Sequence, residues 1–247
     1  MATLESNRCF MEFNPQSSLA PDNVSSDHIY LSSLAPVAGA ESGPVGGLAK
    51  RIIDILIAVT ALIALAPLMI GVALIIWLSS NGPILYGHQR VGFGGRTFRC
   101  WKFRSMVVDG DVVLERHLRA NPEAQREWER DRKLRQDPRV TPIGAVIRML
   151  SIDELPQLFN ILSGEMSVVG PRPVVAAELR RYRGSAGHYL RTRPGLTGMW
   201  QVSGRSDLSY RQRVLLDRYY VMRWNVLADA AIILRTVPAV LRSRGSC

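Results

Sequence analysis

One stretch of this sequence restricts the possible folds more than any other. The twenty-four residues 55–78 contain no charged side chain. As a straight helix they would extend about 36 Å, enough to cross a hydrocarbon core of roughly 30 Å. The stretch therefore predicts a membrane helix, and the polar remainder of the chain must fold beside it.

A proline near the middle of the stretch limits how such a helix can lie in a membrane. Pro67 lacks a backbone N–H, so it kinks or breaks the helix that contains it. Two arrangements remain: a kinked span, or two half-helices that enter and leave at the same membrane face. Basic residues flank the stretch on both sides, at Lys50, Arg51, Arg90, Arg96 and Arg99. Because basic residues accumulate on the cytoplasmic side, this pattern mildly favours the re-entrant arrangement.

Charge is distributed unevenly along the chain, which carries +10 overall. Residues 1–49 have a net charge of −4, so residues 50–247 carry +14. A basic body indicates an acidic partner: phosphorylated substrates, anionic lipids or nucleic acid. The cysteines at positions 9, 100 and 247 are too widely separated to indicate a disulfide framework or a zinc site.

Local signals predict the elements on either side of the apolar stretch. Residues 1–47 are rich in Ser, Pro, Ala and Gly and are expected to be disordered. Residues 83–104 predict a β-hairpin around Gly-Phe-Gly-Gly at 92–95, because no Gly-Lys-Ser/Thr sequence follows that would indicate a phosphate loop. Residues 111–136 predict an exposed helix pair broken at Pro122. Further elements are predicted at 143–150 (apolar helix), 166–169 (buried strand), 209–223 (helix capped by Ser209) and 226–241 (core-packed or interfacial helix).

Two adjacent carboxylates, Asp153 and Glu154, are the strongest candidates for chemistry. Taken alone, the segment 151–158 is more typical of a helix start, in which Ser151 and Glu154 form a capping box. The surroundings shift this interpretation. Arg148 precedes the pair, and Arg172 follows between two prolines that would hold its side chain in one direction. Arginines beside carboxylates suit a substrate that carries phosphate groups.

Five motifs in a fixed order extend this interpretation to most of the chain. They are Lys-Arg-Ile-Ile-Asp at 50–54, Lys-Phe-Arg-Ser-Met at 102–106, Asp-Glu-Leu-Pro-Gln at 153–157, Gly-Pro-Arg-Pro at 170–173 and Arg-Pro-Gly-Leu-Thr-Gly at 193–198. From about residue 50 to residue 241 the chain resembles the bacterial sugar transferases known as monotopic phosphoglycosyl transferases. It is similar to members that start exopolysaccharides on undecaprenyl phosphate. The resemblance implies an α/β, mainly α, fold with a tail (1–47), a proline-broken re-entrant helix (48–80) and a cytoplasmic domain with a β-hairpin and interfacial helices (81–247).

The same resemblance implies a reaction. Asp153 would attack the sugar-bearing phosphate of a UDP-sugar, UDP-galactose or UDP-glucose, and undecaprenyl phosphate would then take the phosphosugar from it. Asp153 and Glu154 would also hold Mg²⁺, which needs only one or two carboxylates plus substrate phosphates. The substrate-binding residues that it implies are Lys102, Arg104, Arg148, Arg172, Arg205, Asp217 and Asp229. The enzyme would lie at the bacterial inner membrane, facing the cytoplasm and touching its lipids.

Two other classes of function remain open. A membrane-anchored binder of nucleic acid or anionic lipid would explain the basic charge, yet it leaves the carboxylate pair without a role. A scaffold for a polysaccharide assembly complex would tolerate Asp153→Asn, whereas the enzyme would not. We favour the enzyme and expect no nucleic-acid partner. Oligomeric state is open, a homodimer included.

Overall fold

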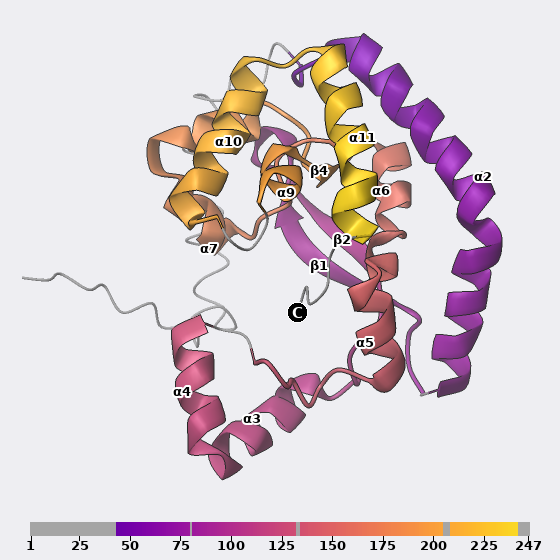
Figure 1. Cartoon of the computed structure of the whole chain (residues 1–247), viewed down its shortest axis with the longest axis vertical. Helices are drawn as coiled ribbons and strands as arrows, with labels where there is room; N and C mark the ends of the chain where they lie inside the picture. Colours follow the sequence, from indigo (N-terminus) through magenta and orange to yellow (C-terminus); the bar gives the residue numbers. More distant parts are fainter. Residues whose placement is uncertain (1–42, 80, 132–133, 205–207, 242–247) are drawn as a thin grey trace, which may run out of the picture.

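The computed structural model describes residues 43–79, 81–131, 134–204 and 208–241 (Figure 1). Most of the predicted tail lies outside these residues. The described part is mostly helical, with an antiparallel pair of strands, β1–β2, and a parallel pair, β3–β4. This agrees with the prediction of a mainly helical fold that carries a short hairpin.

The apolar stretch lies within one helix, α2 (Gly47–Ser79). Helical structure continues through Pro67, so the predicted break is not an interruption between two helices, although the ribbon bends about half-way along (Figure 1). The first half packs on α6 (Gln157–Ser163) and β3 (Ser167–Val169). The second half packs through Val72 and Ile76 against Phe103 and Ile147. Both halves of α2 therefore dock on the same body.

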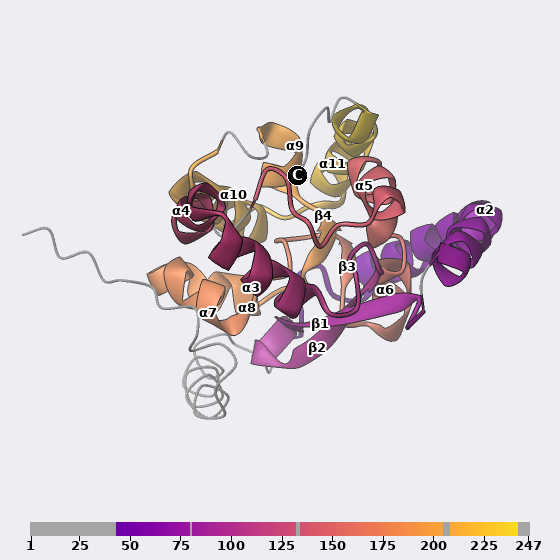
Figure 2. The same ribbon diagram turned by 90° about the horizontal axis from the view of Figure 1, so that it is seen from below.

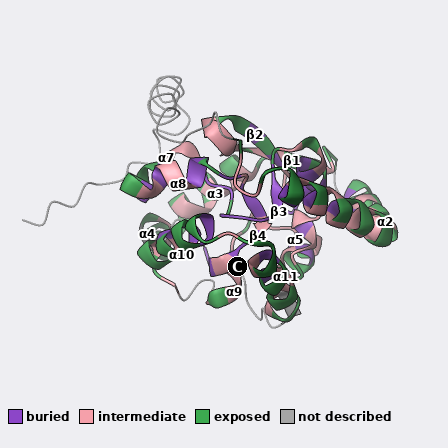
Figure 3. Ribbon diagram, turned by 90° about the horizontal axis from the view of Figure 1, so that it is seen from above, coloured by how far each residue is buried: buried purple, intermediate pink, exposed green. Residues whose placement is uncertain are grey.

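Most of the apolar surface of α2 is not covered by the rest of the protein (Figure 3). Leu56, Ile63 and Leu78 are 62%, 73% and 75% exposed, and no residue between 59 and 71 is buried. Among the described residues, α2 is the one helix long and apolar enough to cross a membrane. A contiguous apolar surface of this size indicates membrane association.

The predicted hairpin is confirmed. β1 (Leu85–Val91) pairs antiparallel with β2 (Thr97–Phe103), and the turn between them contains Gly94 in a left-handed conformation that suits glycine. At the other edge of β2, the backbone N–H of Trp101 donates to Asn160 Oδ1 at 3.0 Å, and Asn160 Nδ2 donates to the Arg99 carbonyl at 2.7 Å. One buried amide thus takes the place of a third strand and fixes β2 against α6.

The helix pair predicted after the hairpin is also present. α3 (Gly110–Ala120) and α4 (Pro122–Asp131) project from the body in Figure 1, and Pro122 begins the second helix. The chain then enters α5 (Pro142–Met149), where the Thr141 hydroxyl caps the first turn by accepting from Gly144 N–H. The chain therefore leaves the body of the protein after β2 and returns to it at α5. The two points are neighbours, because a β-bridge between Met106 and Val140 links them.

The remaining elements surround the parallel strand pair. β3 pairs with β4 (Gly195–Thr197), and the prediction of a buried strand at 166–169 is confirmed. Ser209 and Gln212 form a capping box at the start of a helix, as predicted. The elements not yet given are the 3-10 helices η4 (Phe93–Gly95), η5 (Ile152–Glu154) and η6 (Arg180–Ser185) and the helices α7 (Ala176–Leu179), α8 (Ala186–Leu190), α9 (Met199–Ser203), α10 (Tyr210–Met222) and α11 (Val226–Leu241).

Candidate active site

The carboxylate pair lies on η5, the short turn that joins α5 to α6. Ser151 immediately before it adopts a left-handed backbone conformation, with φ of 57°, and its side chain makes no capping hydrogen bond. The capping box that the segment taken alone would suggest for Ser151 and Glu154 is therefore absent. Left-handed backbone is costly for a residue other than glycine, and such conformations concentrate at functional sites.

Lys102 reaches both carboxylates from β2. Its Nζ lies 2.7 Å from Glu154 Oε1 and 3.5 Å from Asp153 Oδ2. The side chain of Asp153 is 10% exposed and that of Glu154 is 22% exposed. Because Asn160 holds β2 against α6, the distance between this lysine and the carboxylates is set by the fold.

Two arginines complete the cationic surroundings, as the sequence predicted. Arg172, held between Pro171 and Pro173, places its Nη2 3.8 Å from Glu154 Oε1. Its side chain is 44% exposed, so it can also meet a ligand from solvent. Arg148 on α5 is half-buried and near enough for its charge to act on Asp153.

Burial and charge affect the two carboxylates in opposite directions. Burial raises the pKa of Asp153, and Glu154 adds to that effect, while the charges of Lys102 and Arg148 offset it in part. Burial also opposes ionisation of Glu154, but Arg172, Lys102 and Arg90 outweigh it and hold the pKa of this carboxyl below its ordinary value. Neighbouring carboxylates with separated pKa values are typical of sites where the two groups have different roles.

Other predicted residues lie elsewhere. Arg104 follows the last residue of β2 and is buried, and its guanidinium donates to the Asn81 carbonyl at 3.4 Å. Asp217 is buried on α10 and accepts from the Tyr182 hydroxyl at 2.8 Å. Arg205 lies outside the described residues. Within the described part of the chain, the ion pairs and hydrogen bonds found for the carboxylate pair involve neither Arg104 nor Asp217, so their binding roles stay predictions.

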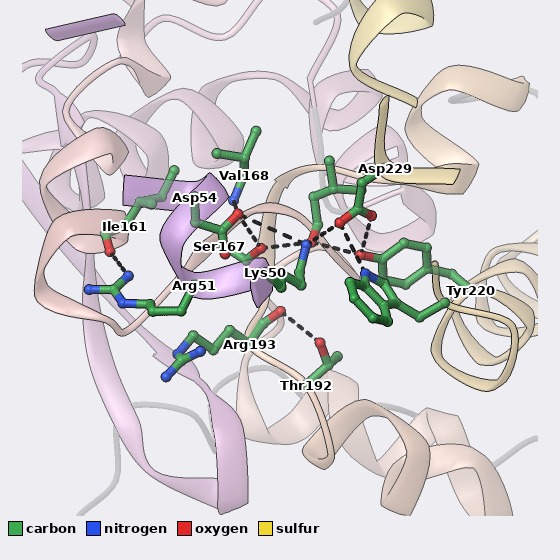
Figure 4. Close-up of polar contacts among 12 residues, drawn as sticks. Lys50, Arg51, Asp54, Ile161, Ser167, Val168, Thr192, Arg193, Tyr220 and Asp229 are labelled. Carbon is green, nitrogen blue, oxygen red and sulfur yellow. Dashed lines mark hydrogen bonds and ion pairs between the residues drawn. The ribbon is translucent and has the colours of Figure 1, made fainter. Parts of the chain in front are cut away.

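Asp229 belongs to a second charged cluster, which Figure 4 shows. Lys50 Nζ at the start of α2 lies 2.6 Å from Asp229 Oδ2 and 3.9 Å from Asp54 Oδ1. All three residues are buried. The sequence analysis assigned Asp229 to the substrate, a role that stays a prediction, and it attached no partner to Lys50 or Asp54.

Polar groups from three other elements close this cluster. Ser167 Oγ and Val168 N–H each donate to Asp54 Oδ1 at 3.0 Å. The hydroxyl of Tyr220 donates to Asp229 Oδ1 at 2.7 Å, and Trp224 Nε1 donates to Asp229 Oδ2 at 3.0 Å. These bonds join α2 to β3, α10 and α11. The cluster therefore fixes the membrane helix to the body.

The cleft beside the carboxylate pair includes residues that the sequence analysis did not assign to binding. It is lined by Lys102, Glu154 and Arg172, and also by Arg90, Cys100 and Gln157. The sequence analysis had used Arg90 only as one of the basic residues that flank the apolar stretch. Tyr86, His88 and Arg90 are spaced two residues apart on one strand, so their side chains share a face. With the hairpin pairing, this spacing could have indicated that Arg90 shares that face with Lys102.

The pair was also predicted to hold Mg²⁺. No group of three or more acidic, histidine or cysteine side chains gathers within the described residues. Two carboxylates that already share a lysine ammonium nevertheless form a site for a cation. Mg²⁺ is commonly bound by one or two carboxylates together with substrate phosphates, so the donor set fits the ion. Its presence remains a proposal.

Comparison with known proteins identifies the family. A sequence model described as bacterial sugar transferase matches residues 45–243. The chain belongs to this family. The protein is therefore a transferase, and the resemblance inferred from its motifs is confirmed.

Individual members of the family are similar over most of the chain. The exopolysaccharide production protein ExoY of Sinorhizobium fredii is 56% identical over 203 residues, which cover 82% of this chain and 90% of that protein. The undecaprenyl-phosphate galactose phosphotransferase of Salmonella typhimurium is 49% identical over 200 residues, covering 80% of this chain and 41% of that protein. The undecaprenyl-phosphate glucose phosphotransferase of Komagataeibacter xylinus is 43% identical over 213 residues, covering 81% and 37%.

Proposed function

We propose that this transferase moves a phosphosugar from a UDP-sugar, UDP-galactose or UDP-glucose, to undecaprenyl phosphate, as the first membrane step of exopolysaccharide synthesis. The names of its relatives support this reaction. The observation that carries it is the position of Lys102, within 3.5 Å of two adjacent carboxylates. Together with Arg172 at 3.8 Å, it forms a site in which anionic phosphates and carboxylates can meet.

In the first step Asp153 is the nucleophile. One of its oxygens attacks the sugar-bearing phosphorus, the bond from that phosphorus to the bridging oxygen breaks, and UMP leaves with the electron pair. A phosphosugar remains on Asp153. Burial favours this role, because it removes water from the carboxylate and raises its pKa, which makes it more basic.

In the second step an oxygen of undecaprenyl phosphate attacks the same phosphorus. The bond to Asp153 breaks, the carboxylate is restored, and undecaprenyl diphosphate sugar is formed. Ping-pong kinetics follow from this sequence of steps. Glu154, held ionised by its three cationic neighbours, would keep Lys102 and Arg172 in place for both phosphates.

Cations must offset the repulsion between Asp153 and a diphosphate. Lys102, Arg148 and Arg172 supply three positive charges from three separate elements. Asp153 and Glu154 would also hold Mg²⁺, which supplies further charge neutralisation when bound. The two carboxylates would then exchange part of their interaction with Lys102 for the ion, leaving the lysine for a phosphate.

We further propose that α2 is re-entrant at the inner membrane, with the body in the cytoplasm. The first turns of α2 are fixed by Lys50 and Asp54, and its second half packs on the body through Val72 and Ile76. A straight span would carry one of these docking sites into or across the bilayer. A curved helix can instead insert its uncovered middle and keep both ends at one face.

The reaction is tested by incubating purified protein with a panel of UDP-sugars and polyprenyl phosphate while UMP release is monitored. We expect release only with a hexose-bearing UDP-sugar, and the lipid should become a diphosphate sugar. Without lipid, a phosphosugar mass should appear on the peptide that contains Asp153. Transfer without this adduct, in a variant lacking the Asp153 carboxylate, would contradict the mechanism.

Topology is tested with Cys9, which precedes α2 in the sequence. In right-side-out vesicles a membrane-impermeant maleimide should label Cys9 only after the membrane is opened. Labelling from outside would show that α2 spans the membrane. Replacing Pro67 with leucine restores a helix hydrogen bond and favours a straight helix of spanning length, so this variant should shift Cys9 toward the outside.

A further inference from the structure

Arg90 shares one face of the hairpin with the lysine that contacts the carboxylate pair. The strand register pairs Tyr86 with Lys102, His88 with Cys100 and Arg90 with Phe98. Because side chains alternate along a strand and opposite residues share a face, Arg90, Cys100 and Lys102 point the same way. The cleft beside Glu154 is lined by all three, which agrees with this register.

Within the described residues Arg90 forms no ion pair at contact distance, although its charge acts on Glu154. Its Nη1 donates to the Pro173 carbonyl at 3.3 Å, and this acceptor is neutral. Burial, and next to it the charge of Arg172, lower the pKa of Arg90, so two guanidinium groups are held near each other in a half-buried cleft. Glu154 is a single carboxylate that faces these two guanidinium groups and also Lys102, so the three cations outnumber it and would stabilise a further anion in the cleft.

The orientation of the hairpin also distinguishes the two ends of the cleft. β1 begins at Leu85, six residues after α2 ends at Ser79, and the strands run away from α2 toward the bridge between Val91 and Val174 (Figure 2). Lys102 therefore lies near the end of the hairpin that is next to the membrane helix. Arg90 lies about 13 Å farther along the strand than the residue opposite Lys102, at roughly 3.3 Å per residue.

The geometry points to Arg90 as a binding residue for the leaving-group phosphate of a nucleoside diphosphate sugar, on the side of the cleft that is remote from the membrane. Arg172, between Arg90 and Glu154, would contact the diphosphate from the other side. The lipid phosphate arrives from the membrane side, where Arg148 and Lys102 lie, and does not reach Arg90. This inference rests on the proposed function and divides its two substrates between two ends of one cleft.

The test compares Arg90→Gln with Arg99→Gln. Arg99 belongs to the same hairpin, is exposed and lies on its opposite face, so its replacement is a matched loss of charge. UDP binding to the purified protein is measured by calorimetry, with inorganic pyrophosphate as a competitor. We expect Arg90→Gln to weaken UDP binding about 10- to 100-fold and Arg99→Gln to leave it within about two-fold.

Steady-state kinetics then separate the two substrates. KM for the UDP-sugar should rise in Arg90→Gln, while KM for polyprenyl phosphate stays as in the wild type. Unchanged UDP affinity in the folded variant, or an equal rise in KM for the lipid, would overturn the inference. Arg90→Lys, which keeps the charge but loses the planar fork, should fall between the wild type and Arg90→Gln and replaces it if the latter does not fold.

Failure of the proposed function gives a different result. A wild-type protein that binds UDP through Arg90 but releases UMP from no UDP-sugar would refute the transfer reaction and leave the binding assignment intact. A wild-type protein that binds neither UDP nor pyrophosphate would refute the role of Arg90.

Discussion

The described part of the protein contains two clusters in which one lysine faces two aspartate or glutamate side chains, and they differ in how far they are enclosed. Lys102 faces Asp153 and Glu154 with its side chain 27% exposed. Lys50 faces Asp54 and Asp229 with its side chain 4% exposed. The first cluster, the open cluster, borders a cleft. The second, the sealed cluster, lies between α2, β3 and α11.

The difference between them shows that partners, more than residue types, decide the role of a charged group. In the sealed cluster Ser167, Val168, Tyr220 and Trp224 supply hydrogen bonds from the protein itself, so the charges hold the fold together. In the open cluster the additional partners are half-exposed cations, which a phosphate ligand can also engage. A buried charge without its partner is costly, whereas an accessible one can exchange partners.

Removing the carboxylate charge in the open cluster should affect catalysis most. Asp153→Asn removes the proposed nucleophile, and we expect the transfer rate to fall at least about 1,000-fold while the melting temperature stays close to that of the wild type. UMP release and thermal unfolding measure the two effects. Mass spectrometry must confirm that the asparagine has not deamidated. Transfer near the wild-type rate in Asp153→Asn would refute the assignment of Asp153 as the nucleophile.

The equivalent change in the sealed cluster should act on stability instead. Lys50→Met leaves Asp54 and Asp229 buried without their cation, which typically costs about 3–5 kcal/mol. We expect a melting temperature lower by roughly 10 °C in detergent, with kcat of the remaining folded protein close to the wild-type value. If instead kcat fell 100-fold with no loss of stability, the sealed cluster would have to take part in the reaction.

Exchanging one cation for another at the edge of the open cluster should have a smaller effect. Arg172→Lys keeps the charge but loses the planar fork that matches two phosphate oxygens, so kcat/KM should fall about ten-fold. The control is Arg191→Lys. Arg191 is an exposed arginine at the end of α8, and this exchange should leave kcat/KM unchanged. Equal activities in the two variants would make Gly-Pro-Arg-Pro a rigid turn only.

The smallest effect is expected at Asp217. This side chain is buried like those of the sealed cluster, but it accepts its hydrogen bond from a tyrosine and not from a lysine. Burial raises its pKa to about 7 despite the hydrogen bond from Tyr182, and Glu178 adds to the rise. The native state therefore keeps this proton to a higher pH than the unfolded state does. Stability should fall as pH rises from about 4 to about 7 and level off above that.

Asp217→Asn tests this dependence, because the amide still accepts from Tyr182 and cannot ionise. We expect its melting temperature to exceed that of the wild type by roughly 8 °C at pH 8, and the difference to become small near pH 4.5. Thermal unfolding at both pH values measures it. A constant difference across pH would exclude ionisation of Asp217 as the cause.

Elements with local signals could be predicted from the sequence, whereas pairings between distant residues could not. The helix at 226–241 and the capping box of Ser209 with Gln212 were predicted because their signals lie within one turn or one periodic segment. Lys50 and Asp229 are 179 residues apart, and no local pattern connects them. The left-handed conformation of Ser151 was missed because a Ser-x-x-Glu sequence more commonly forms a capping box.

Within the candidate site, the position of a side chain could be predicted where the backbone continued as assumed, while its role was not tested. Lys102 lies inside β2, so the side that it faces follows from strand alternation. Arg104 follows the last residue of the strand, and its guanidinium donates to the Asn81 carbonyl in the segment that follows α2, a contact that strand alternation does not predict. Arg172 was located by the two prolines beside it, which restrict the backbone locally.

The docking of both halves of α2 also has a consequence for how the enzyme meets its lipid. If α2 inserts as proposed, a body attached at both ends of the inserted helix would keep its cleft at a constant height above the headgroups. Encounter with the proposed substrate, undecaprenyl phosphate, would then be a search by lateral diffusion in two dimensions. Its rate would depend on the mole fraction of the carrier among the membrane lipids, so that diluting the carrier with inert lipid should slow the second half-reaction at constant bulk concentration.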